Sequence, residues 1–271
     1  LLFYLATASG DYRVEARIRS EQISGSPLPI TITPAVIDAR NTYAWCGTNV
    51  SSCGLDQAVT GTPGTFDIQA LDRFGNLITR GGDTLNVLIR SSTYFDAVVE
   101  DKDDGTYSAL YVITQAAQFV VDVTVQAIRD VGTLPNPLRI KASPFTVRGI
   151  PAEPPSPEAC VVYGPGLNNA SVGQIRTFTI EARDLYGNRM TKGGDSFRVM
   201  LALSPKPLLA PFYFAEREDL RQGTYKISYS LTAAGRYSME IAFRERQHPF
   251  ALFAIKGSPF DVWFAPGDTD P

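Results

Sequence analysis

Apolar and polar residues alternate along many short stretches of this chain. Residues 178–183, Phe-Thr-Ile-Glu-Ala-Arg, show the pattern, and residues 106–112 and 119–125 repeat it. A period of two places successive side chains on opposite faces of an extended strand, so each stretch predicts a strand with one buried face. Turn-forming residues separate these stretches about every 8–12 residues, and no stretch has helical spacing over a useful length. The pattern predicts an all-β fold in which sheets pack face to face.

Several short motifs recur in one order, which indicates internal repeats. Gly105-Thr106-Tyr107 recurs as Gly223-Thr224-Tyr225, and residues 66–76 recur as 178–188, 112 positions later (178 − 66 = 112). A Ser-Pro motif preceded by Gly or Ala occurs at 25–27, 142–144 and 257–259. We therefore predict a tandem array: the last strands of a truncated repeat at 1–34, a repeat at 35–150, a repeat at 151–265 and a tail at 266–271. Since the first segment alone would leave sheet edges unpaired, we expect the natural protein to extend N-terminally.

The order of these motifs resembles the filamin-type repeat. The third segment carries the whole set, which comprises Tyr163-Gly164-Pro165-Gly166-Leu167, 178–184, Gly187-Asn188, Gly193-Gly194-Asp195, Gly223-Thr224-Tyr225 and Gly257-Ser258-Pro259-Phe260. The resemblance implies tandem immunoglobulin-like β-sandwich repeats. The second repeat matches from Gly54 onward and departs before it, at an insertion that spans residues 46–53.

Two cysteines, Cys46 and Cys53, bracket this insertion. Both occur in the one segment that departs from the family pattern, which favours a disulfide between them. In the loop-entropy model, closing this short loop contributes about 2.5 kcal/mol. The alternative is a pair of reduced thiols in a cytosolic loop. We expect Cys160, in the first strand of the third repeat, to be a buried free thiol.

Two N-glycosylation sequons bear on the compartment, Asn49-Val50-Ser51 and Asn169-Ala170-Ser171. About one such match is expected by chance in a chain of this composition, so their positions matter more than their number. Both lie between the first and second predicted strands, and one lies inside the insertion. They favour an extracellular location; the alternative is cytoplasmic, where most filamin repeats occur.

Composition removes several classes of function. The chain has 271 residues, a net charge of −3, one His and three Cys. The slight acidity gives no case for nucleic acid or an anionic membrane surface. One His makes classical zinc sites and His-based triads nearly impossible, and no nucleotide-binding or nucleophile motif is present. We expect no enzyme activity, catalytic residue, metal, cofactor or small-molecule substrate.

The candidate partner site is the third strand of each repeat. Filamin-type repeats are similar in binding extended peptides along the exposed edge of this strand. Residues 84–90 and 196–202 form it here, with alternate residues facing the core. On the opposite face lie the candidate partner-binding residues Leu88, Arg90, Arg198 and Met200. The alternative is that Leu88 and Met200 are ordinary exposed apolar residues.

These features lead to two hypotheses for function. The first is a cell-surface adhesion or recognition ectodomain, which resembles the extracellular filamin-repeat proteins of plant and algal gametes and implies gamete attachment before membrane fusion. Its partner would be a protein, either a surface receptor or another copy of the chain, and a segment outside residues 1–271 would anchor it in the plasma membrane. The second is a cytoskeletal filamin-like scaffold that binds partner peptides by strand addition.

Overall fold

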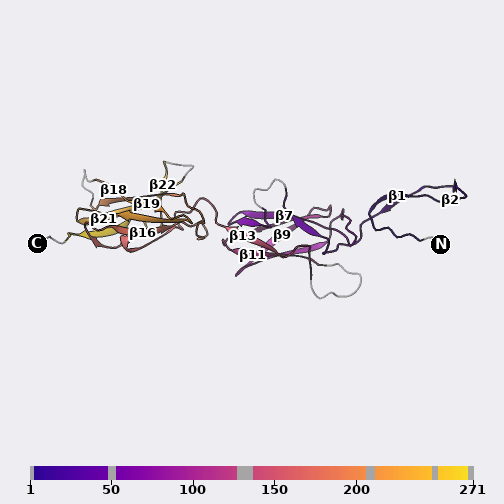
Figure 1. Cartoon of the computed structure of the whole chain (residues 1–271), viewed down its shortest axis with the longest axis horizontal. Coiled ribbons are helices and arrows are strands. Elements are labelled where there is room, and N and C mark those ends of the chain that lie inside the picture. Colours follow the sequence, from indigo (N-terminus) through magenta and orange to yellow (C-terminus); the bar gives the residue numbers. More distant parts are fainter. Residues whose placement is uncertain (1–2, 48–52, 127–136, 206–210, 246–249, 268–271) are drawn as a thin grey trace. The chain divides into compact units, whose positions relative to one another are not determined.

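The computed structural model describes residues 3–47, 53–126, 137–205, 211–245 and 250–267 (Figure 1). The chain divides into two compact units, one formed by Leu1–Ile113 with Ala117–Gly149 and the other by Thr114–Ala116 with Ile150–Pro271. Within the described ranges, both units consist of strands and turns, and the second also contains a short 3-10 helix, η1 (Pro165–Leu167). Among these residues, no helical segment has the length and apolar character of a membrane span.

The N-terminal part of the first unit forms two small sheets. They contain β1 (Gly10–Val14), β2 (Arg17–Ile18), β3 (Glu21–Gln22) and β4 (Leu28–Ile32). β1 pairs with β4 and β2 pairs with β3, both antiparallel. None of residues 3–34 is buried, so these strands have no core of their own.

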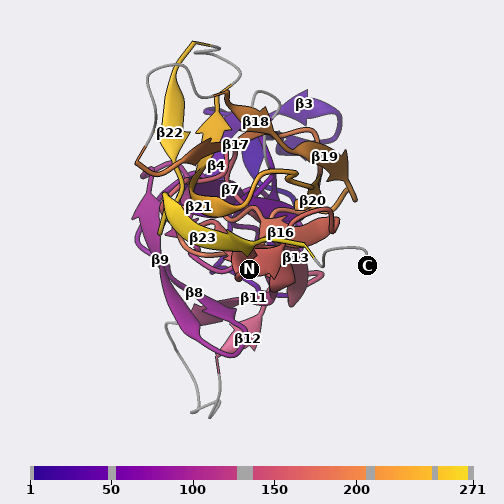
Figure 2. The same cartoon turned by 90° about the vertical axis from the view of Figure 1, so that its left-hand side faces the viewer.

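Nine strands form the sandwich of the first unit. They are β5 (Tyr43–Trp45), β6 (Gln57–Val59), β7 (Pro63–Gln69), β8 (Thr84–Arg90), β9 (Tyr94–Asp101), β10 (Thr106–Val112), β11 (Gln118–Gln126), β12 (Leu138–Arg139) and β13 (Phe145–Ile150). One layer has the order β5-β7-β10-β9, and the other runs β9-β8-β11-β13-β6, with β12 added to β11. β9 pairs with both β10 and β8, so it passes from one layer to the other. Figure 2 shows β8 and β9 side by side.

The second unit repeats this plan, except that two short strands, β18 and β19, stand where the first unit has β9. Its strands are β14 (Val161–Tyr163), β15 (Ala170–Ser171), β16 (Arg176–Glu181), β17 (Ser196–Leu203), β18 (Tyr213–Phe214), β19 (Glu216–Asp219), β20 (Thr224–Tyr229), β21 (Gly235–Arg244), β22 (Leu252–Ala254) and β23 (Phe260–Ala265). The layers are β14-β16-β20-β19 and β15-β23-β21-β17-β18. The predicted class, all-β tandem immunoglobulin-like β-sandwich repeats, is therefore confirmed.

Each sandwich has its own apolar core, built by the alternation seen in the sequence. Every second residue of β8 is buried, as is every second residue in most of β17. Tyr111 and Tyr229 are buried at equivalent positions, and each hydroxyl donates a hydrogen bond to a glycine carbonyl, that of Gly54 and that of Gly166. Burial raises the pKa of Tyr111 and of Tyr229 to about 12. A buried tyrosine thus ties each sheet to the chain that leads away from the first strand.

The Ser-Pro motif has one local structure in all three places. The Ser26, Ser143 and Ser258 hydroxyls accept hydrogen bonds from the backbone N–H groups of Ala16, Val123 and Ile241, each at 2.9 Å. The following proline begins the turn into β4, β13 or β23 and needs no donor for the ladder. The same bond thus occurs in the N-terminal strands, at Ser26, and in both sandwiches.

A buried aspartate organises the turn that follows β7 in the first unit and β16 in the second. Asp72 is 1% exposed, and its carboxylate accepts hydrogen bonds from the backbone N–H groups of Ala35, Phe74 and Asn76 and from the Asn76 side chain. Burial acts to raise its pKa, but these donors outweigh it and hold the pKa at about 2, against an ordinary 3.8. The charge is therefore kept and satisfied inside the fold.

The Asp72 carboxylate predicts an acid-sensitive component of stability. Because its pKa is lowered on folding, its contribution is present above pH 3.8 and is lost as the pH falls toward 2. Asp72→Asn should reduce the free energy of unfolding at pH 7 by about 2–3 kcal/mol. It should also flatten the stability curve between pH 4 and pH 2, measured by urea unfolding. Asp56→Asn, which alters an exposed carboxylate in the same unit, is the control; equal pH dependence in wild type and Asp72→Asn would contradict the assignment.

Gly105 predicts a second, purely steric effect. Its φ is +84°, and a Cβ there would lie 1.9 Å from the carbonyl oxygen of Ile78. Gly75 has nearly the same φ, +85°, with nothing within 4 Å of the added Cβ. Gly75→Ala should therefore cost about 1 kcal/mol through backbone strain alone, and Gly105→Ala should cost clearly more. Equal losses in thermal unfolding would show that the close approach to Ile78 has no energetic weight.

Candidate protein-binding edge

The predicted partner site, the third strand, corresponds to β8 in the first unit and β17 in the second. Its core-facing residues are buried as predicted: Leu85, Val87 and Ile89 in β8, and Phe197, Val199 and Leu201 in β17. The remaining residues lie on the outer face of the sheet. A partner segment can pair with the strand only where the N–H and C=O groups along its edge are not already hydrogen-bonded.

The edge of β8 is covered along its second half, which the sequence did not predict. β9 pairs with Leu88, Ile89 and Arg90, so the backbone beside two of the candidate residues already has a partner strand. Beyond this point β9 departs to pair with β10. In the described structure no strand pairs with Thr84–Val87 on this side. Within the described residues, the open backbone edge on this side is therefore confined to the first half of β8 and does not run along the whole strand, as the sequence had led us to expect.

The alternation of the backbone identifies which groups face the open edge of β8. Ser91 donates its N–H to the Thr93 carbonyl on the β9 side, and residues two apart in a strand point their polar groups the same way. The N–H and C=O groups of Val87 and Leu85 therefore face the open edge. The Asn86 carbonyl, in the opposite phase, accepts a hydrogen bond from the Thr124 hydroxyl of β11.

The edge of β17 is shorter and is closed at both ends. The Ala215 N–H donates to the Val199 carbonyl at 3.3 Å, and the Arg217 guanidinium donates to the Asp195 carbonyl at 2.6 Å. Both carbonyls lie in the outward phase, and Phe197 occupies the same phase between them. The second unit thus presents the backbone N–H and C=O of one residue, Phe197, at this edge.

The four candidate side chains differ in how they meet solvent. Leu88 is 42% exposed, whereas Arg90, Arg198 and Met200 are half-buried. The Arg90 guanidinium donates to the Asp122 carboxylate at 3.2 Å. Leu88 and Arg90 lie on one face of β8, and Arg198 and Met200 lie on the matching face of β17. Leu88 is therefore the candidate that offers apolar surface beside an open edge.

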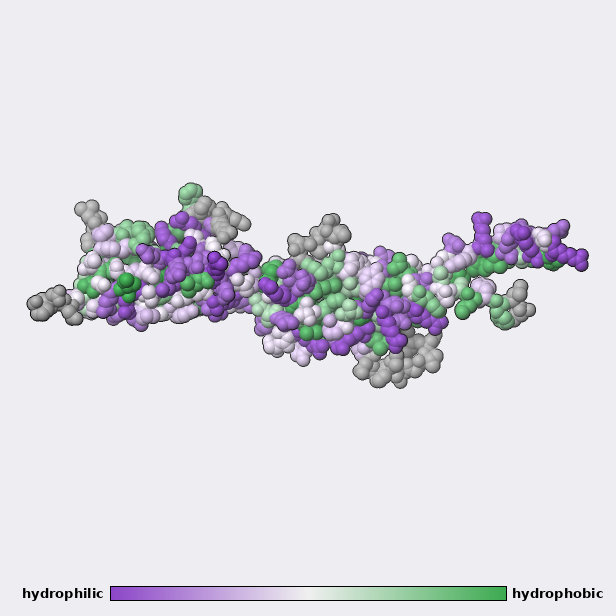
Figure 3. Space-filling model, in the orientation of Figure 1, coloured by the Kyte–Doolittle hydropathy of each residue, from purple (hydrophilic) through white to green (hydrophobic). Residues whose placement is uncertain are grey.

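An ion-pair cluster fixes the outer face of the β8 sheet. Asp122 in β11 accepts two hydrogen bonds from Arg139 (2.7 and 2.8 Å) as well as that from Arg90. The Arg139 hydrogen bonds, opposed by burial, lower the pKa of Asp122. Both guanidinium groups are thus held by one carboxylate, which neutralises one of their two positive charges next to Leu88. In Figure 3 hydrophobic and hydrophilic residues are interspersed on the visible face of each unit.

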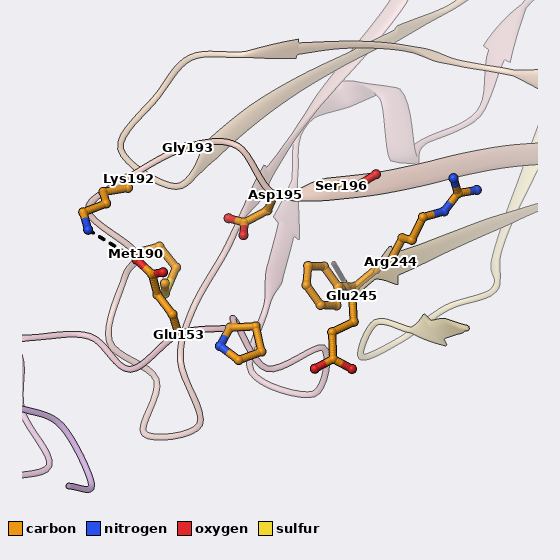
Figure 4. Close-up of a pocket in the computed structure, with 10 residues that line it drawn as sticks. Glu153, Met190, Lys192, Gly193, Asp195, Ser196, Arg244 and Glu245 are labelled. Atoms are coloured by element: carbon orange, nitrogen blue, oxygen red, sulfur yellow. Dashed lines mark ion pairs between the residues drawn. The ribbon is translucent and has the colours of Figure 1, made fainter. Parts of the chain in front are cut away.

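A shallow groove of about 380 Å³ lies at the start of β17 (Figure 4). Met190 and Phe243 contribute its apolar base, and Asp195, Ser196 and Arg244 are among its polar residues. At its rim, Lys192 and Glu153 form an ion pair at 3.6 Å. The Asp195 carboxylate accepts a hydrogen bond from the buried Tyr225 hydroxyl at 2.7 Å, and burial together with this bond raises the pKa of Tyr225.

No group of three or more His, Cys, Asp or Glu side chains in the described ranges is placed to hold a metal ion. Cys46 and Cys53 form a disulfide with a Cα–Cα distance of 5.4 Å, which matches the predicted pairing. Cys160 is buried and free, as expected, and burial raises the pKa of its thiol. A thiol in this state is a poor nucleophile.

The two sequons differ in what the structure describes. Asn49 lies outside the described residues. Asn169 is exposed just before β15, and its side-chain oxygen accepts a hydrogen bond from the backbone N–H of Trp263 at 3.0 Å. Trp263 is 49% exposed on the adjacent strand β23, a feature that the sequence analysis did not single out. Its signal was present in the alternation of residues 260–265, which places Trp263 in the outward phase.

Comparison with known proteins agrees with this architecture. A family model described as the Filamin/ABP280 repeat matches residues 38–146 and 154–261. Filamin-C of Mus musculus is 24% identical over 270 residues, which cover 97% of this chain and 8% of that protein. The human E3 ubiquitin-protein ligase TRIM45 is 34% identical over 106 residues, 39% of this chain and 17% of that protein. The chain thus spans less than a fifth of either relative.

Two solved structures share the fold over 95% of this chain. The Escherichia coli adhesin FdeC has a TM-score of 0.56 at 16% identity and is covered over 74% of its length. Invasin, titled a bacterial integrin-binding protein, has a TM-score of 0.52 at 14% identity and is covered over 46%. Because the two segments matched by the family model together cover well over half of the chain, this protein belongs to the filamin-repeat family.

Proposed function

We propose that this chain is part of a cell-surface adhesion or recognition ectodomain. The observation that carries the proposal is the Cys46–Cys53 disulfide, which closes an insertion between β5 and β6. Disulfides persist in oxidising compartments and are rare in the cytosol. The exposed sequon at Asn169 also supports an extracellular location.

The working part of the ectodomain is the backbone edge of its sandwiches. Two residues of β8, Leu85 and Val87, direct N–H and C=O groups at this edge, and Leu88 supplies apolar surface beside it. Such an edge accepts an extended segment of a protein partner by strand addition. The titles of FdeC and invasin describe an adhesin and an integrin-binding protein, so this architecture serves surface binding elsewhere.

We further propose the biological setting and the limits of the repeats. Disulfide-bearing filamin repeats outside the cell resemble gamete-surface adhesion proteins, so the setting is attachment of gametes before membrane fusion. The partner is a surface receptor or another copy of the chain, and the membrane anchor lies in a segment outside residues 1–271. The repeats occupy 35–150 and 151–265, preceded by part of another at 1–34 and followed by a tail at 266–271.

A second candidate function is a cytoskeletal scaffold in the cytoplasm. It is favoured by the similarity to Filamin-C over 97% of the chain. The same open edges would then bind partner peptides inside the cell. At the level of the family, both candidates are binding functions and neither is enzymatic.

The compartment can be measured on the native protein. Peptide mapping without reduction should recover Cys46 and Cys53 in one disulfide-linked species, and surface biotinylation of intact cells should label the protein. Cys160 provides an internal control, because it should be alkylated only after unfolding. Reduced Cys46 and Cys53 in protein protected from biotin would instead establish the scaffold.

The edge can be tested by substitution at Leu88. Leu88→Asp places a charge beside the open edge and should weaken binding of the chain to partner-bearing cells at least about tenfold, which corresponds to 1.4 kcal/mol. Leu110→Asp is the matched control, since Leu110 is 41% exposed on the other layer of the same sandwich. Binding can be measured by flow cytometry on gametes of each type with the labelled chain, after thermal unfolding confirms that both variants fold. Equal binding by the two variants would exclude the β8 edge.

A further inference from the structure

Asn169 and Trp263 form a pair on the outer face of the second sandwich. β15 runs parallel to β23, with Ala170 opposite Phe264 and Ser171 opposite Ala265. Because facing residues of neighbouring strands project to the same side, Asn169 and Trp263 lie together one position earlier. Phe264 is fully buried, so this preceding pair is directed away from the core.

The hydrogen bond between the two residues orients the asparagine amide. The Asn169 side-chain oxygen accepts a hydrogen bond from the backbone N–H of Trp263 at 3.0 Å, so the amide lies beside the residue that bears the indole. This bond engages the oxygen and not the amide nitrogen, which is the atom that carries the sugar in N-glycosylation. The residue is exposed, and the hydroxyl residue of its sequon, Ser171, belongs to the short edge strand β15.

The exposed indole of Trp263 has no role in the core that would explain it. Its cross-strand neighbour on the other side, Arg236, directs its guanidinium to Asp261 at 2.7 Å. The neighbours Val262 and Phe264 fill the core instead. A half-exposed tryptophan in this position exposes a broad apolar surface to water.

The first unit provides an internal comparison. Phe145 and Phe260 follow the Ser-Pro motif in each repeat, so the position three residues later is Arg148 in one and Trp263 in the other. Leu55 and Leu167 correspond likewise, which places Gln57 at the position of Asn169. The tryptophan and the sequon thus occur together in the second unit and are both absent at the equivalent positions of the first.

We propose that Asn169 carries an N-linked glycan whose first N-acetylglucosamine packs on the indole of Trp263. The sugar ring has an apolar face of C–H groups, and the negative face of an indole attracts such polarised hydrogens. The inference rests on the extracellular location in the proposed function.

The glycan also limits strand addition on this sheet of the second sandwich to one of its two edges. In the order β15-β23-β21-β17-β18, β15 is one edge of the sheet, and β17 with β18 forms the other. A glycan at Asn169 covers the β15 edge and blocks strand addition there. The Phe197 position of β17 then remains as the open edge of this sheet.

The test is a comparison of glycosylated and unglycosylated protein with and without the tryptophan. The 271-residue chain is secreted from eukaryotic cells with Ser51→Ala in every variant, so that the sequon at Asn49 is silent. Mass spectrometry should find Asn169 occupied, and Ser171→Ala should remove the glycan. We expect the glycosylated chain to unfold about 2–4 °C higher than Ser171→Ala. Trimming to one N-acetylglucosamine with an endoglycosidase should retain most of this shift.

Trp263→Arg, which installs the residue of the first unit, should reduce the glycan-dependent shift by at least half, measured against Trp263→Arg with Ser171→Ala. In the wild-type background the N-acetyl methyl proton signal of the trimmed sugar should also move upfield through the indole ring current. An unoccupied Asn169, or an equal shift with and without Trp263, would overturn the inference. Neither result depends on partner binding, so failure of the Leu88→Asp prediction leaves this test independent.

Discussion

The fold depends on a buried carboxylate placed at the same turn in both sandwiches. Asp72 and Asp184 are both almost inaccessible to solvent, and each accepts N–H groups from its own turn. Each also accepts an N–H from the segment that leads into the first strand, at Ala35 or Ala152. A buried charge is tolerated only with this degree of compensation. The turn and the start of the repeat, more than 30 residues apart in sequence, are thereby fixed to one point.

The asparagine that follows extends this constraint to the preceding chain. In the first unit, Asn76 donates to the Thr7 carbonyl and accepts from the Ser9 N–H. In the second unit, Asn188 makes the same two bonds with Thr114 and Ala116. Since the aspartate fixes the asparagine side chain at 2.8–3.1 Å, one motif serves two purposes. These hydrogen bonds explain why asparagine recurs at the end of the turn. The preceding glycine recurs for a separate reason, its positive φ.

The sequence predicted what depends on local pattern. The alternation in 84–90 identified Leu85, Val87 and Ile89 as core residues, and the insertion identified Cys46 and Cys53. The sequence did not predict the path of β9, because a strand that pairs first with β8 and then with β10 has no distinctive pattern of apolar and polar residues. The open edge was therefore assigned to the whole strand, although Leu88 and Arg90 already have a backbone partner. Likewise, the Asn188 hydrogen bonds join residues more than 70 positions apart, which no periodicity reveals.

The way the chain crosses between layers decides how much edge each sandwich can offer. In the first unit β9 crosses as one continuous strand and leaves β8 at Leu88, so two outward-phase residues, Leu85 and Val87, remain open. In the second unit the crossing is divided into β18 and β19, and Ala215 and Arg217 bond to the carbonyls on either side of Phe197. An added strand gains its affinity from consecutive backbone hydrogen bonds. The number of open backbone groups therefore favours the first unit, which carries the disulfide-closed insertion, as the one that receives a partner strand. The second unit could add hydrogen bonds at one residue, Phe197.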